Sequence, residues 1–198
     1  MSRYETSSKK TPCVVYSFGV QNESSFEEEV LKRTSCDVFG LDFSVDEFSP
    51  QVQQLPRDMR ERAHFLRAGI SGVSDLSANP PFYNIHDLME MNGHDYVDIL
   101  KMDIEGFEFD ALQSLVREYA GQALPIGQLQ VEIHLNEHID GLPSFLKWWE
   151  SLEKGGLRPV WTEPNLLQIT MKLADAMPRY AEYTFINAKN RRNILLTD

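Results

Sequence analysis

A short, nearly continuous apolar run close to the amino terminus constrains the fold more than any other feature of this sequence. Residues 13–18 (CVVYSF) show no polar alternation, and the run ends at Gly19. A run of this kind is typical of a strand buried on both faces, and such strands occur in parallel sheets. Ser24 and Glu27 then predict the start of a helix with a capping box, in which two side chains satisfy free backbone N–H groups. The chain is therefore expected to open as a strand, a glycine turn and a helix.

The same alternation of strand and helix continues along the chain. Further strands are predicted at residues 37–43, 64–70, 96–104, 129–135, 158–162 and 183–187, and helices at 85–91, from 106 onward and at 142–154. Residues 44–62 and 163–182 have mixed patterns, and 74–83 is predicted to be a loop because it contains two consecutive prolines. Strands that alternate with helices indicate an open α/β sheet. Its ligand is expected beyond the carboxyl ends of the strands, next to the first strand.

Length and charge limit the number of domains and the kinds of partner. The chain has 198 residues, enough for one domain, which we expect at 12–198 after a flexible tail at 1–11. Thirty acidic and 19 basic side chains give a net charge of -11. Such a surface repels phosphate backbones, so no nucleic-acid partner is expected. No apolar run approaches the roughly 20 residues of a membrane helix, so no membrane partner is expected either.

The cysteines and the absence of several motifs narrow the class further. Cys13 and Cys36 lie in apolar stretches and are predicted to be buried free thiols of a reducing compartment, which favours a cytoplasmic location. The polar residues 1–10 lack the apolar core of a signal peptide. The sequence has no G-x-S-x-G elbow, no P-loop and no zinc-type spacing of cysteine and histidine. These absences leave nucleophilic hydrolase, P-loop and zinc chemistry without support.

The loop after the first strand and the end of the second strand carry the first candidate ligand-binding residues. A glycine at position 19 lets the backbone approach a ligand closely, but a dinucleotide fingerprint would need three glycines. Glu23 in the same loop would repel a phosphate and attract an ammonium group. Asp42 ends the second strand, where an acid accepts hydrogen bonds from ribose hydroxyls in related sheets. A solvated loop carboxylate at this position is the structural alternative.

Charged residues in two predicted central strands are the most specific feature. Lys101, Asp103 and Glu105 alternate, so they share one face of a strand that should be apolar. Glu132 and His134 do the same in the next strand, and they converge with Asp103 and Glu105 if the two strands are neighbours. A lysine–aspartate pair with a purely structural role is one interpretation, because buried charges need partners. A histidine general base with a carboxylate, or a divalent cation site, are the two functional ones.

Two stretches resemble a known family. Residues 99–112 (ILKMDIEGFEFDAL) resemble the L-K-I-D-I-E-G-x-E motif of FkbM-type methyltransferases, a branch of the class I S-adenosylmethionine-dependent enzymes. Residues 14–29 (VVYSFGVQNESSFEEE) resemble the Y-S-F-G-I-x-x-x-x-S-F-[DE] opening of the methyltransferase-like proteins within that branch. Further matches lie at 40–44, 68–72, 91–94 and 130–135. The resemblance extends over residues 13 to about 187, which is nearly the whole chain.

The resemblance implies a fold, a cofactor and a set of binding residues. The fold is a Rossmann-like, seven-stranded and mostly parallel α/β sheet of order 3-2-1-4-5-7-6, in which strand seven is antiparallel. Strand six would be residues 158–162 and strand seven residues 183–187. The cofactor is S-adenosylmethionine. Its methionine part would contact Ser17, Phe18, Gly19 and Glu23, its ribose Asp42, its adenine Ile70 and Ser71, and Asp103 would face it from the end of strand four.

The expected reaction is methyl transfer to a hydroxyl group of a small molecule, such as a sugar or a natural product. This displacement needs positioning and removal of the acceptor proton rather than covalent help from the protein. His134 is the predicted base, Asp103 and Glu105 are predicted to orient cofactor and acceptor, and no metal is expected. Two alternatives remain at this stage. One is N-methylation of an amine, and the other is a non-catalytic, cofactor-binding or regulatory module of the same fold.

Overall fold

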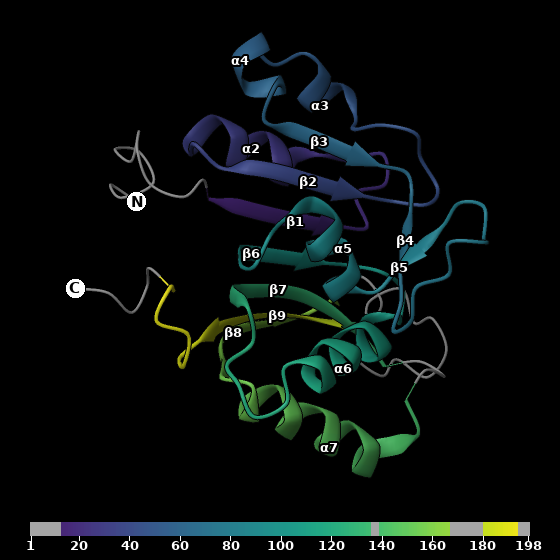
Figure 1. Ribbon diagram of the computed structural model, residues 1–198, viewed down its shortest axis with the longest axis vertical. Coiled ribbons are helices and arrows are strands. Elements are labelled where there is room, and N and C mark those ends of the chain that lie inside the picture. Colours follow the sequence, from purple (N-terminus) through teal and green to yellow (C-terminus); the bar gives the residue numbers. More distant parts are fainter. Residues whose placement is uncertain (1–12, 136–138, 167–179, 194–198) are drawn as a thin grey trace.

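The computed structural model describes residues 13–135, 139–166 and 180–193, and a seven-stranded sheet runs through them (Figure 1). Its strands are β1 (Val14–Phe18), β2 (Asp37–Leu41), β3 (Ala63–Leu66), β6 (Val97–Met102), β7 (Ile126–His134), β8 (Leu157–Pro164) and β9 (Tyr180–Asn187). The spatial order is β3-β2-β1-β6-β7-β9-β8. All neighbours pair in parallel except β9, which is antiparallel to both β7 and β8. This confirms the expected order 3-2-1-4-5-7-6 with an antiparallel strand seven.

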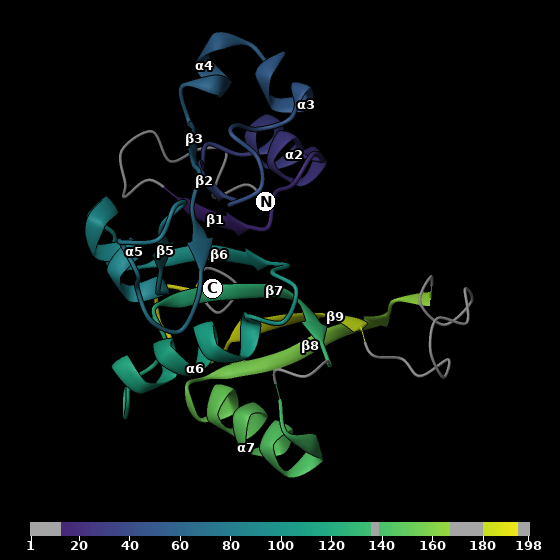
Figure 2. The ribbon, with the colours of Figure 1, turned by 90° about the vertical axis from the view of Figure 1, so that its right-hand side faces the viewer.

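Helices cover the sheet on both faces, and Figure 2 shows α2 and α5 on opposite sides of it. The helices are α2 (Ser25–Arg33), α3 (Pro50–Gln53), α4 (Arg57–Arg60), α5 (Ile85–Asn92), α6 (Glu108–Glu118) and α7 (Gly141–Lys154). Alternate side chains of β1 enter different cores. Tyr16 and Phe18 belong to the larger apolar cluster with α5, α6 and α7, whereas Val15 shares a second cluster with Leu31 of α2. The first strand is thus buried on both faces, as its apolar run predicts.

The strand predicted at 64–70 is divided in two. β3 ends at Leu66, and β4 (Gly69–Ile70) instead pairs with β5 (Phe82–Tyr83) in a separate two-stranded sheet. The prediction that 74–83 is only a loop is therefore wrong at its end. A Cβ atom on Gly69 would collide with the ring of Phe82, so a larger residue at this position would displace that ring. The small sheet lies at the carboxyl ends of the large one and forms one wall of the pocket described below.

The predicted capping box does not form. The side chain of Ser24 makes no capping bond to α2, and its Oγ instead accepts a hydrogen bond from the Ser49 amide. Glu27 is buried, and it accepts a hydrogen bond from the hydroxyl of Ser17 at the end of β1. Both side chains thus serve tertiary contacts, which override the local capping pattern.

The two cysteines form a disulfide, so the prediction of free thiols is wrong. Cys13 and Cys36 precede β1 and β2, and the register of these strands pairs Val14 with Asp37. The preceding residues are therefore neighbours, with Cα atoms 4.4 Å apart. Both cysteines are buried, as predicted. The expectation of a reducing compartment, which depended on free thiols, loses its basis.

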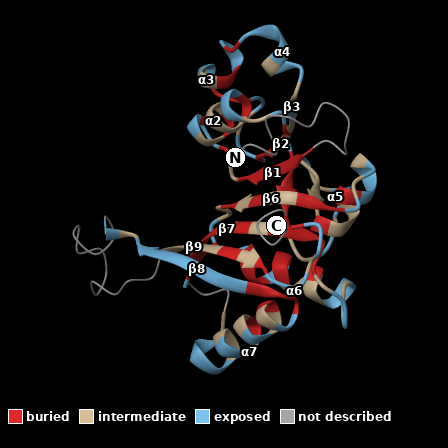
Figure 3. Cartoon of the chain, turned by 90° about the vertical axis from the view of Figure 1, so that its left-hand side faces the viewer, coloured by how far each residue is buried: buried red, intermediate tan, exposed pale blue. Residues whose placement is uncertain are grey.

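Burial follows the middle of the sheet (Figure 3). The residues of β1 are all buried, whereas β8 is exposed along most of its length at the sheet edge. In the described ranges, no helix has both the length and the apolar character needed to cross a bilayer. The expected tail at 1–11 and most of the unassigned stretch 163–182 lie outside the described residues.

Candidate functional site

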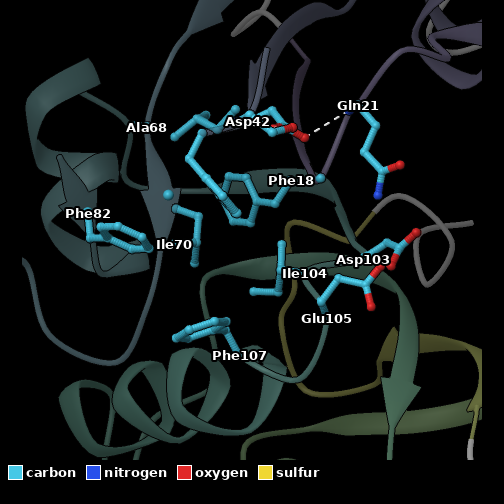
Figure 4. A pocket seen from close by; sticks show the side chains of 15 residues that line it. Phe18, Gln21, Asp42, Ala68, Ile70, Phe82, Asp103, Ile104, Glu105 and Phe107 are labelled. Atoms are coloured by element: carbon cyan, nitrogen blue, oxygen red, sulfur yellow. Dashed lines mark hydrogen bonds between the residues drawn. The ribbon is translucent and has the colours of Figure 1, made fainter. Parts of the chain in front are cut away.

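A pocket opens at the carboxyl ends of β1, β2 and β6, where the sequence places the ligand (Figure 4). Its apolar walls come from four segments, namely the end of β1, the β4–β5 pair, the loop after β6 and the start of α6. The side chains that form them are Phe18, Ile70, Phe82, Ile104 and Phe107. Figure 4 shows the carboxylates of Asp42, Asp103 and Glu105 on the side of the pocket away from Phe82. The arrangement suits a ligand with an apolar, flat part and a polar part.

Gly19 fixes how closely the first turn approaches the end of β6. Its φ is +78°, and a Cβ atom at this position would collide with the carbonyl oxygen of Asp103. The two backbones touch there, and the amide of Asp103 donates to the carbonyl of Phe18 at 3.1 Å. A glycine is required at this turn because of both the backbone conformation and the lack of space. The result places Asp103 directly beside the pocket.

Asp42 connects the loops that follow β1 and β2. The residue is 6% exposed, so it is not the solvated loop carboxylate of the structural alternative. One carboxylate oxygen accepts the amide of Gln21 at 2.8 Å, and the other accepts the amide of Ser44 at 2.7 Å and its hydroxyl at 2.6 Å. Gln21 has a φ of +49°, a left-handed conformation that this bond helps to hold. Asp42 therefore shapes the pocket edge as well as lining it.

A histidine surrounded by four carboxylates lies next to the pocket. The ring of His134, 3% exposed, contacts Glu108 through Nδ1 at 3.1 Å. Its Nε2 faces three carboxylates at longer distances: Glu105 at 3.5 Å, Asp103 at 3.7 Å and Glu132 at 3.8 Å. We call these five residues the acid–histidine cluster. The convergence that alternation predicts for strands four and five is confirmed.

Glu108 is the member of the cluster that sequence reasoning misses. It stands in the first turn of α6, is fully buried, and its Oε1 also accepts the amide of Ile104 at 2.9 Å. Its position inside the motif at 99–112 was the available signal, but strand alternation cannot place a helical residue against His134. The aromatic walls Phe82 and Phe107 are missed as well. Neither belongs to a periodic pattern that would point to a pocket.

The charges of the cluster change how its members titrate. Burial alone would lower the pKa of His134, but the hydrogen bond and charge of Glu108, with the charges of Glu132 and Asp103, raise it to about 9. The imidazole is therefore mainly protonated at neutral pH. Burial, followed by the charge of Glu132, raises the pKa of Asp103, whose buried Oδ1 has no hydrogen-bond partner among the described residues. One imidazolium thus balances only part of the negative charge at this site.

The acidic character continues across the neighbouring strands. Glu132 on β7 pairs in register with Glu182 on β9, and burial raises the pKa of Glu182. Lys101 points its Nζ to the carbonyl of Gly19 at 3.4 Å. Within the described residues it forms no ion pair with Asp103 at 4.0 Å or less, so the structural alternative of a lysine–aspartate pair is not found. The charge of Lys101 still lowers the pKa of Asp103 from a distance.

Three of the expected cofactor residues lie outside the pocket lining. Ser17 is fully buried and is bonded to Glu27. Glu23 is exposed and accepts hydrogen bonds from Ser25 and from the side-chain amide of Gln51. The hydroxyl of Ser71 donates to the carbonyl of Val73 in its own turn. The lining does contain the other expected residues, which are Phe18, Gly19, Asp42, Ile70 and Asp103.

Comparison with known proteins places the chain in a family. Residues 2–172 match the family model described as a methyltransferase domain. The curated relatives include a probable methyltransferase-like protein 24 of Rattus norvegicus, 28% identical over 152 residues, and its Homo sapiens counterpart, 27% identical over the same length. Each alignment covers 72% of this chain and 39% of the relative, so the chain spans about two fifths of their length. These matches do not single out the FkbM type.

Solved structures share the fold at low identity. A human methyltransferase 10 domain containing protein matches 93% of this chain and 75% of its own, with a TM-score of 0.52 and 8% identity. A putative tRNA (m1A22) methyltransferase of Streptococcus pneumoniae matches 96% of this chain and 72% of its own, with a TM-score of 0.45 and 12% identity. Such likenesses show the fold alone.

The prediction that excluded nucleic acid is contradicted, since the solved neighbours include an RNA methyltransferase, METTL16, whose methyltransferase domain matches 96% of this chain with a TM-score of 0.50 and 8% identity. The physical reason is that a net charge of -11 describes the whole chain, whereas an acceptor meets only one local surface. The acceptor therefore cannot be limited by net charge. The sheet order, the pocket at its carboxyl edge and the family match agree, and the chain belongs to the family of S-adenosylmethionine-dependent methyltransferase domains.

Proposed function

We propose that this domain binds S-adenosylmethionine in the pocket and transfers its methyl group to a hydroxyl of a small-molecule acceptor at the acid–histidine cluster. One observation carries the proposal. Asp103 and Glu105 line the pocket, and the same carboxylates lie 3.7 and 3.5 Å from Nε2 of His134. The pocket and the cluster therefore share a boundary at which a methyl donor and an acceptor would meet. The motif at 99–112, which contains both carboxylates, supports the FkbM type within the family.

The pocket offers a matching group for each part of the cofactor. Asp42 retains lone pairs for ribose hydroxyls, because an ionised carboxylate has about four acceptor sites and three are used. Ile70 and Phe82 would enclose the adenine, and the Phe18–Gly19 turn would approach the methionine part. Ser17, Glu23 and Ser71 lie outside the lining. We propose that these three shape the surrounding loops rather than touch the cofactor.

The cofactor supplies an activated methyl group on a sulfonium, and the protein must position the acceptor and receive its proton. Asp103, Glu105 and His134 are the residues in place for that task. Because His134 is mainly protonated at neutral pH, its neutral, basic form is a minor one there. Burial raises the pKa of Asp103, so its ionised carboxylate is a stronger base than that of an ordinary aspartate.

The test is transfer of an isotope-labelled methyl group to a panel of sugars, phenols, amines and RNA, with Asp103→Asn beside the unchanged protein. The proposal expects labelled product from hydroxyl compounds, and at least about a 100-fold lower rate in the variant. Product formed only on RNA would contradict the small-molecule acceptor, and product formed only on amines would contradict the hydroxyl assignment. Cofactor binding without product on any class would favour a binding module.

A second acceptor class has one observation in its favour. Four carboxylates surround His134, and Glu182 adds a fifth acidic group nearby. Such a surface attracts an ammonium group. N-methylation of an amine is therefore the second candidate, and the amines in the same panel decide between the two.

A further inference from the structure

The distances around Nε2 of His134 are too long for hydrogen bonds and suit the ligands of one ion. Three carboxylate oxygens lie 3.5 to 3.8 Å from Nε2. Ligand atoms that are each about 2.1–2.3 Å from a divalent cation are about 3–3.5 Å from one another. The ligand atoms of Asp103, Glu105 and His134 all lie within 4.8 Å of one another. A small inward movement of these side chains would complete a coordination sphere.

The hydrogen bond on the far side of the His134 ring is typical of a metal-bound histidine. Its Nδ1 contacts the buried carboxylate of Glu108, which is itself held by the amide of Ile104. A carboxylate that accepts the Nδ1 proton fixes the direction of the ring, and Nε2 becomes the ligand atom when the cation displaces its proton. The ring is 97% buried (3% exposed), and its Nε2 forms no hydrogen bond within the described part of the chain.

The carboxylates of Asp103 and Glu132 are both directed toward Nε2 of His134. Oδ1 of Asp103, 3.7 Å from Nε2, is buried and has no hydrogen-bond partner in the described part of the chain, which is costly unless a ligand uses it. Glu132 accepts a hydrogen bond from Asn165 through Oε1, which directs Oε2 toward His134. A structural role in the core explains neither carboxylate, because a purely structural position would hold an apolar side chain or a fully hydrogen-bonded one.

Backbone strain brings the last carboxylate to the site. Glu105 has a φ of +57°, a conformation that costs a non-glycine residue on the order of 1 kcal/mol. Its side chain is 71% exposed, yet Oε2 lies 3.5 Å from Nε2 of His134. A glutamate in this conformation is retained at a cost, and the cluster is where its carboxylate is directed.

We propose that Asp103, Glu105 and His134, with Glu132 as a fourth ligand, bind a divalent cation beside the acceptor. Three carboxylates and one imidazole suit Mn²⁺ best, then Mg²⁺, because hard cations prefer oxygen and the imidazole favours Mn²⁺ over Mg²⁺ and Ca²⁺. This inference revises the expectation of a metal-free site. The role of the ion depends on the proposed function, but its binding does not.

The ion narrows the acceptor to a hydroxyl with a second oxygen beside it, as in a vicinal diol. Both oxygens would coordinate the ion, and the pKa of the coordinated hydroxyl would fall. The hydroxyl proton leaves to solvent or to a carboxylate, the oxygen forms a bond to the methyl carbon, and the bonding pair of the broken carbon–sulfur bond goes to sulfur. No strong free base is then required.

The test is titration of metal-free protein with Mn²⁺ alone. The electron paramagnetic resonance signal of free Mn²⁺ measures how much of the ion is bound. One site is expected, with affinity reduced about tenfold or more in Glu105→Gln. The matched control is Glu29→Gln on α2, an exposed carboxylate paired with Arg33, and it should bind like the unchanged protein. Glu105 is exposed, so its variant should fold, and circular dichroism checks this. If the protein binds no Mn²⁺ at millimolar concentration, or if both variants bind it equally well, the inference is overturned.

A second titration separates this inference from the proposed function. S-adenosylmethionine is added to the chelated protein in a calorimeter, where the pocket should bind it without the cation. If the protein binds the cofactor but does not bind Mn²⁺, only the cation site is overturned. If the protein binds Mn²⁺ but does not bind the cofactor, the cation site is supported and the proposed function is contradicted.

Discussion

The two ends of β1 and β2 have opposite characters. At the amino ends, Cys13 and Cys36 are buried and joined by a disulfide, and the apolar cluster around Val15 packs beside them. At the carboxyl ends, Gly19 has a positive φ, and Asp42 is a buried carboxylate. One end is built from groups that stabilise the fold, while the other keeps polar groups that stability alone would remove. Changes at the amino ends should therefore alter unfolding, and changes at the carboxyl ends should alter ligand binding.

The largest effect is expected at the amino ends. Replacing Cys13 and Cys36 by serine opens a disulfide with a sequence separation of 23 residues, which should lower the free energy of unfolding by about 3.5 kcal/mol. Denaturant unfolding measures this loss. Affinity for S-adenosylmethionine should change less than about twofold, because the pocket is at the other end of the strands. A large loss of affinity with unchanged stability would break the comparison.

The next effect gives the carboxyl ends a pH-dependent stability. In metal-free protein the pKa of His134 is raised to about 9, above its ordinary value of 6.5. The folded state therefore holds the proton more tightly, so this stabilisation is complete below pH 6.5 and is lost as the pH rises through 9. It is on the order of 2–3 kcal/mol at pH 7.

Unfolding measured between pH 7 and 10 checks this dependence on chelated protein. The stability of the unchanged protein should decline more steeply than that of His134→Gln. The disulfide variant serves as control and should keep the original slope, because its change lies at the opposite end of the sheet. Equal slopes for the unchanged protein and His134→Gln would show that the carboxylates do not hold this proton.

Asp42→Ala should produce a smaller, mixed effect. Affinity for S-adenosylmethionine should fall by about 1.5–3 kcal/mol if the carboxylate accepts hydrogen bonds from the ribose hydroxyls. The residue is 6% exposed and accepts bonds from Gln21 and Ser44, so stability should also fall, by about 1–2 kcal/mol. Calorimetry and denaturant unfolding measure the two losses. An unchanged dissociation constant would remove Asp42 from the site.

Ser71→Ala should have the smallest effect. The Ser71 hydroxyl bonds within its own turn and lies outside the pocket lining, although the motif resemblance implies contact with the adenine. Affinity and stability should each change by less than about 0.5 kcal/mol. A loss of cofactor affinity above about tenfold would restore Ser71 to the binding site.

The sequence predicts much of the fold because apolar periodicity and motif order act along the chain. The parallel strands, the required Gly19 and the convergence of Asp103 with His134 all follow from such local patterns. What it misses depends on contacts between distant segments. Glu27 stands where a capping box would place it, yet it accepts a hydrogen bond from Ser17. Phe82 pairs in a strand with Gly69, which lies 13 residues earlier in the chain. Charge states are also beyond a sequence pattern, because the pKa of His134 depends on all its acidic neighbours.

The disulfide is a different case, because its signal was present in the sequence. Cys13 begins the first predicted strand, Cys36 directly precedes the second, and adjacent parallel strands begin side by side. Combining the strand order with these positions would have placed the two sulfur atoms together. The composition-based interpretation of two free thiols did not use the register of the strands.

The central claim is that the carboxyl ends of the strands bind S-adenosylmethionine while the amino ends do not. The most direct measurement is amide chemical-shift mapping by NMR of the 22.8 kDa chain during titration with the cofactor. The largest shifts are expected at Gly19, Gln21 and Ile70, with little change at Val14 and Asp37. Largest shifts at the amino ends, or no shifts at millimolar cofactor in a folded protein, would contradict the claim.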